Sequence, residues 1–215
     1  MVTAGMGEAK WTGFAPTIII FGLEQASGDI VHTVQGPEAR SVARRSSTGT
    51  VSVVVEGPPG VGTAGENRVA KVLRARLQND DVPSSVRSGV DARGEDRLID
   101  TPQASYVLQV VTVPRDATLW REASAGSGTT SVTTPAAAAW IEDAIQHKVA
   151  SSTTADRGRT ILALDAIHAG VLTEDAVVQS YLEQYGSPTA RFHYAGVWLA
   201  GPVADRCLRL GTGVL

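Results

Sequence analysis

The chain has 215 residues, 43% of them hydrophobic and 19% charged, which excludes a disordered chain and leaves room for one substantial core but not for two full domains. Its net charge of −3 gives no overall attraction to nucleic acid or to anionic membranes, so DNA binding would need a local basic patch or a bound cation. The single cysteine, Cys207, excludes an internal disulfide. No run approaches the ~18 apolar residues of a membrane-spanning helix and no signal pattern is present, so we expect a cytoplasmic protein without membrane contact.

The first part of the chain is rich in short β-type runs that glycine and proline interrupt. Thr17–Phe21, Asp29–Val34 and Thr50–Val55 have the β-branched composition of strands. The arginine- and serine-rich stretch Arg44–Gly49 predicts a loop. We therefore expect residues 1–60 to form a β-rich extension or small module.

A helix and a hairpin follow. The helix from Ala64 to about Asn79 is predicted by a buried stripe at helical spacing, made of Val69, Val72, Leu73 and Leu77. Asp96–Asp100 and Tyr106–Val113 flank a short turn that contains Pro102, as the two arms of a hairpin do. The second arm is apolar on both faces, which indicates a central strand.

Helices and strands then alternate to the end of the chain. A Gly/Ser/Thr-rich loop, Ser124–Thr134, precedes four predicted elements: a helix over Pro135–Val149, a strand over Thr160–Leu164, a helix over Glu174–Tyr185 and a strand over Ala195–Leu199. This alternation predicts an α/β domain over residues 61–215, with a central mixed β-sheet flanked by helices.

A glycine-rich segment before the first helix is similar to a phosphate-binding loop. Residues 57–64 read Gly-Pro-Pro-Gly-Val-Gly-Thr-Ala, and Asp165 ends a later strand as a magnesium-binding aspartate would. Phosphate-loop chemistry needs a lysine and a hydroxyl at positions that here hold Thr63 and Ala64. The sequence therefore favours a glycine-rich turn, and a degenerate nucleotide-binding protein is the third of three functional interpretations.

Polar residues fall at positions that the predicted fold would bury. Glu66 and Lys148 share buried helical stripes, Gln109 interrupts the central strand, and Asp96 and Asp100 lie on the other arm of the hairpin. Burying such groups is costly unless they pair with each other, with water or with a metal. Together they could hold Mg²⁺, with the lysine stabilising a developing anion. Individually, each has an ordinary structural explanation, such as a first-turn glutamate or a lysine that reaches solvent from a helix end.

The order of these residues resembles the PD-(D/E)XK nuclease superfamily, over roughly residues 60 to 200. That family has a helix with an acidic residue, then a hairpin with an aspartate on one arm and Glu/Gln-x-Lys on the next. By this resemblance Glu66 is the helix acid, Asp96 the metal-binding aspartate and Gln109 the Glu/Gln position. Val111 occupies the lysine position, and the resemblance implies that Lys148 of the following helix supplies the lysine instead.

The hairpin register decides which aspartate faces Gln109. Strand side chains change face at each residue, so a four-residue turn that pairs Asp100 with Ser105 would set Asp96 opposite Gln109. Asp96 is therefore the favoured metal ligand, and Asp100 and Asp91 are alternatives.

The resemblance implies a restriction-endonuclease-like core with an N-terminal β-rich extension. It implies a DNA endonuclease dependent on Mg²⁺ or Mn²⁺, in restriction or phage defence, with Glu66, Asp96, Gln109 and Lys148 as the catalytic set and Asp100 as a further metal ligand. DNA is the expected partner, and a homodimer is compatible with it. The second interpretation is a catalytically inactive DNA-binding or assembly module of the same fold, which Val111 favours.

Overall fold

The structure is a computed structural model that describes residues 20–23, 31–35, 40–45, 51–56, 62–90, 95–116, 129–167 and 169–213. Asp91, most of the glycine-rich segment and residues 124–128 of the loop predicted over Ser124–Thr134 lie outside these ranges. The prediction of a loop is wrong for the rest of that stretch, where Thr129–Val132 form a strand and a helix begins at Thr134. The described strands form two sheets, one of five and one of six strands. No described helix is both long enough and apolar enough to cross a bilayer.

The five-stranded sheet has the order β2-β3-β4-β1-β8, from β1 (Ile20–Leu23), β2 (Val31–Gln35), β3 (Arg40–Arg45), β4 (Val51–Glu56) and β8 (Thr129–Val132). Three of these strands overlap the predicted ones. The prediction of a loop from Arg44 is wrong at its start, because β3 extends to Arg45 and pairs with both β2 and β4. β8 pairs in parallel with β1, so a strand from the second half of the chain completes this sheet.

The six-stranded sheet has the order β11-β10-β9-β7-β6-β5. Its strands are β5 (Ser85–Ser88), β6 (Arg97–Asp100), β7 (Ser105–Thr112), β9 (Thr160–Asp165), β10 (Gly196–Ala200) and β11 (Cys207–Arg209). β5, β6 and β7 form an antiparallel meander, and β9 and β10 run parallel to β7. The prediction of an α/β fold with a mixed sheet is confirmed. β5 was not predicted, because three of its four side chains are exposed and leave no buried alternation.

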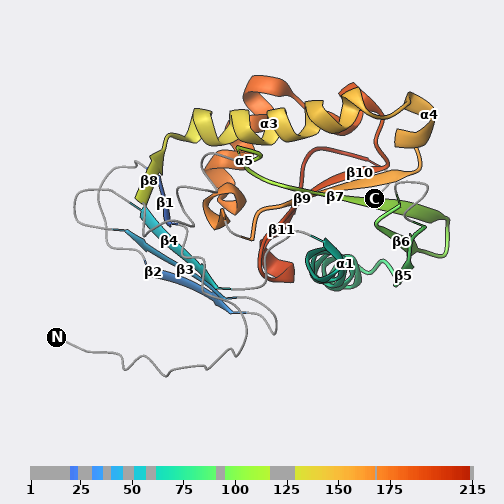
Figure 1. Cartoon of the computed structure of the whole chain (residues 1–215), viewed down its shortest axis with the longest axis horizontal. Coiled ribbons are helices and arrows are strands. Elements are labelled where there is room, and N and C mark those ends of the chain that lie inside the picture. Colours follow the sequence, from blue (N-terminus) through green and yellow to red (C-terminus); the bar gives the residue numbers. More distant parts are fainter. Residues whose placement is uncertain are drawn as a thin grey trace.

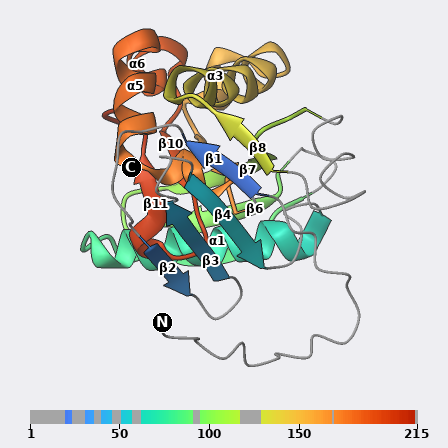
Figure 2. The same ribbon diagram turned by 90° about the vertical axis from the view of Figure 1, so that its left-hand side faces the viewer.

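Helices cover both faces of this sheet (Figure 1). They are α1 (Gly62–Asn79), α3 (Thr134–Ala150), α4 (Thr154–Arg157), α5 (Asp175–Tyr185) and α6 (Pro188–Phe192), with short 3₁₀ turns η2 (Gly170–Thr173) and η3 (Ala204–Arg206). Figure 2 shows α1 on one side and α3, α5 and α6 on the other. The core on the α1 side contains Val69, Leu73 and Leu77 of the predicted stripe, packed with Ile99, Leu108 and Trp198. The core on the α3 side contains Ile141, Ile145, Leu162, Leu164 and Tyr181.

Glu142 joins the helices on the α3 side. Its carboxylate accepts two hydrogen bonds from the Arg191 guanidinium of α6, at 3.0 and 2.7 Å, and one from the Tyr181 hydroxyl of α5 at 3.0 Å. Gln146 donates a fourth at 2.8 Å. Burial alone would raise the pKa of Glu142, but the hydrogen bonds from Arg191, Gln146 and Tyr181 outweigh it and lower the pKa.

The pKa of Glu142 is lower in the folded protein than in the unfolded chain, where it is about 4.3. The charged carboxylate therefore stabilises the fold to its full extent at pH values above about 4.3. The effect is lost as the pH falls through the folded value. We expect Glu142→Gln to lower the free energy of unfolding by about 1–2 kcal/mol at pH 7. The difference from the parent should shrink in urea titrations between pH 5 and pH 3. A difference that stays constant over this range would contradict the assignment.

Arg157 joins the end of α3 to the segment before β10. This buried guanidinium donates to the carbonyls of Ser152 at 2.6 Å and Phe192 at 2.7 Å, and to the Thr154 hydroxyl at 3.0 Å. These groups lie at loop or helix ends, where backbone carbonyls lack helical partners. The Arg157 side chain therefore links the loop after α3, the start of α4 and the end of α6, next to the first residue of β9.

Candidate functional site

The β6–β7 hairpin has the register that the sequence predicts. Asp100 pairs with Ser105 across the turn, and Arg97 pairs with Leu108. The Thr101 N–H donates to the Ala104 carbonyl at 2.9 Å and closes the four-residue turn. Asp96, one residue before β6, is therefore next in register to Gln109.

The Asp96 carboxylate is engaged with the backbone of β7. Its Oδ2 accepts the N–H of Val110 at 2.7 Å, so the side chain continues the hairpin's hydrogen bonding past the first residue of β6. Asp96 is half-buried. It lies beside Gln109, with one of its two oxygens committed to a protein donor.

Gln109 and Val111 lie on the face of the sheet that α3 covers. Side chains alternate along a strand, and Leu108 belongs to the core on the α1 side, whereas Val111 packs against the core on the α3 side. Gln109 pairs in register with Leu162, which also faces α3. Glu66, by contrast, comes from α1 on the opposite face.

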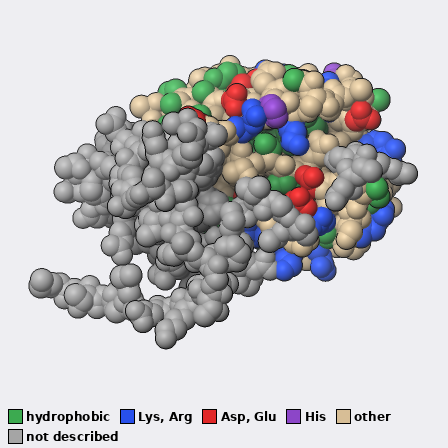
Figure 3. All heavy atoms as spheres, viewed as in Figure 1, with side chains coloured by type: hydrophobic (Ala, Val, Ile, Leu, Met, Phe, Trp, Pro, Cys, Tyr) green, Lys and Arg blue, Asp and Glu red, His purple; other side chains and the backbone are tan. Residues whose placement is uncertain are grey.

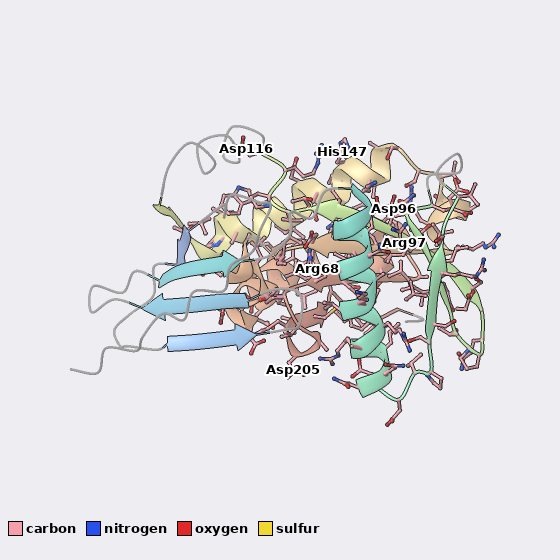
Figure 4. The ribbon with its side chains drawn as sticks, turned by 60° about the horizontal axis from the view of Figure 1, so that its bottom comes forward. Arg68, Asp96, Arg97, Asp116, His147 and Asp205 are labelled. Atoms are coloured by element: carbon pink, nitrogen blue, oxygen red, sulfur yellow. The ribbon has the colours of Figure 1, made fainter. Side chains whose placement is uncertain are left out.

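An arginine that the sequence prediction did not include binds Glu66. The Arg97 Nη1 is 3.1 Å from the Glu66 carboxylate, and its Nε donates to the Asn67 side chain at 2.8 Å. The same Nη1 donates to the main-chain carbonyl of Asp96. Figure 4 shows Asp96 and Arg97 next to each other alongside α1. The guanidinium therefore lies between the helix acid and the start of β6.

The two remaining predicted site residues, Lys148 and Asp100, lie on α3 and at the end of β6. Lys148 is half-buried in the last turn of α3, and no described carboxylate forms an ion pair with it. Asp100 lies at the other end of β6, where hydrogen bonds from Arg87, at 2.7 and 3.1 Å, and from Ser105 lower its pKa. Within the described ranges no three His, Cys, Asp or Glu side chains are grouped to hold a metal ion. The hairpin register sets Asp96 opposite Gln109, whereas Glu66 comes from the helix on the other face of the sheet.

A buried ion pair lies at the carboxyl end of β9. Arg68 of α1 donates to Asp165, and their side chains are 1% and 0% exposed. Asp165 Oδ1 also accepts the Ile167 N–H at 3.1 Å. Within the described part of the chain, the Nε and Nη1 of Arg68 and the Oδ2 of Asp165 have no hydrogen-bond partner. The sequence prediction considered Asp165 only as a magnesium ligand and missed Arg68, although Val72, four residues later on the same side of the helix, belongs to the predicted buried stripe.

The division of the strands between two sheets can be compared with the arrangement around a phosphate-binding loop. β4, which precedes the glycine-rich segment, belongs to the five-stranded sheet, whereas Asp165 ends a strand of the six-stranded sheet. A phosphate-binding loop takes its strand and its acidic residue from the same parallel sheet. The arrangement therefore differs from that of a nucleotide hydrolase, and Asp165 is neutralised by Arg68.

The fold and site together define an α/β protein with a mixed six-stranded sheet and a hairpin that pairs Asp96 with Gln109 beside an arginine-bound glutamate. Comparisons with protein-family models, with curated proteins and with solved structures find no significant match.

Proposed function

We propose that this protein is a DNA-binding module that keeps a restriction-endonuclease-like core and has lost metal-dependent cleavage. The order α1, β5-β6-β7 meander, α3, β9 supports the resemblance to that core, since β9 returns parallel to β7 after a helix on the far face. Asp96 and Gln109 stand at the positions of the metal-binding hairpin residues in that resemblance.

The position of Arg97 is the main observation that supports a loss of metal-dependent cleavage. A guanidinium is permanently charged, and here it neutralises Glu66 and donates to the Asp96 carbonyl. It supplies positive charge to the Glu66 carboxylate, so the neutralisation of this acid does not require a divalent cation. Val111 packs against the apolar core at the position of the missing lysine. Both features favour a site that is stable without metal.

The proposal is tested by measuring DNA binding and cleavage on the full chain. Fluorescence anisotropy with a labelled 20-bp duplex should give a dissociation constant of about 10⁻⁴–10⁻⁶ M near physiological salt, as for binding through phosphates. Supercoiled plasmid with Mg²⁺ or Mn²⁺ should remain uncut. Either the absence of duplex binding or metal-dependent nicking by the purified chain would overturn the proposal.

A metal-dependent endonuclease is the second candidate, and the pairing of Asp96 with Gln109 favours it. In this case Lys148, on the helix after the hairpin, supplies the lysine that position 111 lacks. The parent should nick plasmid in Mn²⁺, Lys148→Ala should abolish nicking, and Arg159→Ala, which removes an exposed charge between α4 and β9, should retain it. Equal activity of the parent and Lys148→Ala would exclude this candidate's catalytic set.

A further inference from the structure

β10 and β11 place an arginine beside a buried tryptophan. Arg209 of β11 pairs in register with Trp198 of β10, and directly paired residues of antiparallel strands have their side chains on the same face of the sheet. The guanidinium carbon of Arg209 lies 5.9 Å from the centre of the Trp198 ring. Trp198 is 2% exposed and belongs to the core on the α1 side, whereas Arg209 is half-buried. The pair therefore lies where this core meets the β11 edge of the described sheet.

Both side chains have buried donors without an acceptor. Within the described residues, the Nε and Nη2 of Arg209 and the indole Nε1 of Trp198 are shielded from solvent and form no hydrogen bond. A buried tryptophan N–H ordinarily has a hydrogen-bond partner, and a buried charge without a counterion is costly. These three donors therefore need an acceptor that the described part of the chain does not supply.

The acid that acts on Arg209 is engaged with another arginine. Asp80, which follows α1, accepts a hydrogen bond from the Arg76 Nε at 2.9 Å. Burial lowers the pKa of Arg209, and the charge of Asp80 raises this pKa without outweighing the burial. α1 packs against β11, and Figure 3 shows Lys and Arg side chains on the surface in the region of α1. The electrostatic surroundings of Arg209 therefore favour a further anion.

Another arginine of this protein shows which anion suits such a set of donors. Arg87 donates from the same two nitrogens, Nε and Nη2, to the two oxygens of Asp100 at 2.7 and 3.1 Å, and the Ser105 hydroxyl donates to the same carboxylate. Two parallel N–H groups of a guanidinium match the two oxygens of a carboxylate. Beside Arg209, the indole N–H of Trp198 corresponds to the neutral third donor. The unpaired donors therefore have the chemistry of a carboxylate site.

We propose that Arg209 and Trp198 form a binding site for the carboxylate of a small molecule. The segment after β11 borders this site, since a Cβ on Gly213 would lie 3.2 Å from the Nη2 of Arg209. Thr212 and Gly213 are exposed, and the Thr189 hydroxyl donates to the Thr212 carbonyl. A ligand that displaces this short segment reaches the guanidinium from solvent. The site is separated from the β6–β7 hairpin by β9, and it is independent of the proposed DNA binding.

The test follows side-chain N–H signals of the full chain by ¹H–¹⁵N NMR during titration with sodium acetate. The signals of Trp198 Nε1–H and Arg209 Nε–H should move downfield and saturate, because each N–H gains a hydrogen bond to an anion. Sodium phosphate tests the other common oxyanion, and sodium chloride at equal ionic strength controls for screening. The spectra of Trp198→Phe and Arg209→Lys identify the two signals by their loss.

The same variants test the role of each donor. Arg209→Lys keeps the charge but removes the paired N–H groups, and the Trp198 signal should report acetate binding at least about tenfold weaker. Trp198→Phe keeps an aromatic ring but removes the N–H, and the Arg209 signal should report binding about fivefold weaker. Arg159→Lys makes the matched change at an exposed arginine before β9 and should keep the parent affinity. Circular dichroism verifies that each variant is folded.

Three outcomes would contradict the proposal. The absence of a saturable shift with acetate, or an unchanged acetate affinity in Arg209→Lys, would overturn the site itself. Saturation by phosphate but not by acetate would overturn the carboxylate as its ligand. If Trp198→Phe does not fold, the comparison of the parent with Arg209→Lys still decides, because Arg209 lies on an edge strand and is only half-buried.

Discussion

Replacing Asp165 with asparagine is expected to lower the free energy of unfolding by about 3–5 kcal/mol, because it leaves the Arg68 guanidinium charged, buried and without a counterion. The pair is 1% and 0% exposed, so water cannot take the place of the lost carboxylate. Asparagine keeps an oxygen for the Ile167 N–H, so the change isolates the loss of charge. Urea denaturation at pH 7 measures the effect.

A double-mutant cycle separates the pair from its surroundings. Arg68→Met alone should also destabilise, because it leaves the Asp165 carboxylate buried without its cation. The combined variant Arg68→Met/Asp165→Asn removes both charges, and we expect it to be more stable than the sum of the two single losses predicts by at least 1 kcal/mol. Additive losses would show that the two charges do not stabilise each other.

The second large effect is expected at Arg157. Arg157→Met keeps much of the apolar stem but removes the donors to the Ser152 and Phe192 carbonyls and to Thr154. Hydrogen bonds to a charged donor contribute about 1.5–3 kcal/mol each, and the half-buried acceptors recover part of this from water, so we expect a loss of about 3 kcal/mol.

Arg157→Lys distinguishes charge from geometry. Lysine keeps the charge but cannot direct several fixed donors toward acceptors on different segments. Arg157→Lys should therefore lower the free energy of unfolding by more than half as much as Arg157→Met does. Arg159→Met, two residues away and exposed, should change the unfolding midpoint little. A full rescue by lysine would show that the charge alone is required.

The elements with a buried face were predictable from sequence. The stripe of α1 and the apolar runs of β7, β9 and β10 are found as expected, since each covers or lies within a core. Four strands were not predicted: β3, β5, β8 and β11. β5 exposes most of its side chains, and β3 follows from pairing with strands on both sides, which local composition does not report.

The candidate site was predictable only where strand geometry fixes it. A turn of known length sets the register, and so the position of Asp96 opposite Gln109 follows from counting residues. The partner of Glu66 did not follow, because an arginine side chain is long and pairs with acids that lie far away in sequence. The same limit applies to Arg68 and Asp165, which are 97 positions apart. Whether Lys148 serves catalysis stays a prediction.

The edge of the six-stranded sheet that β5 forms has a further consequence for solubility. β5 is the last strand on that side of the described sheet, so it is the strand to which a neighbouring molecule could add. It is four residues long, follows Pro83, and carries the exposed Arg87, which Asp100 of the adjacent strand holds in place at 2.7 Å. A short edge with a fixed charge is a poor template for another strand. The ion pair between Arg87 and Asp100 thus also makes β5 less suited to pairing with the edge strand of a neighbouring molecule.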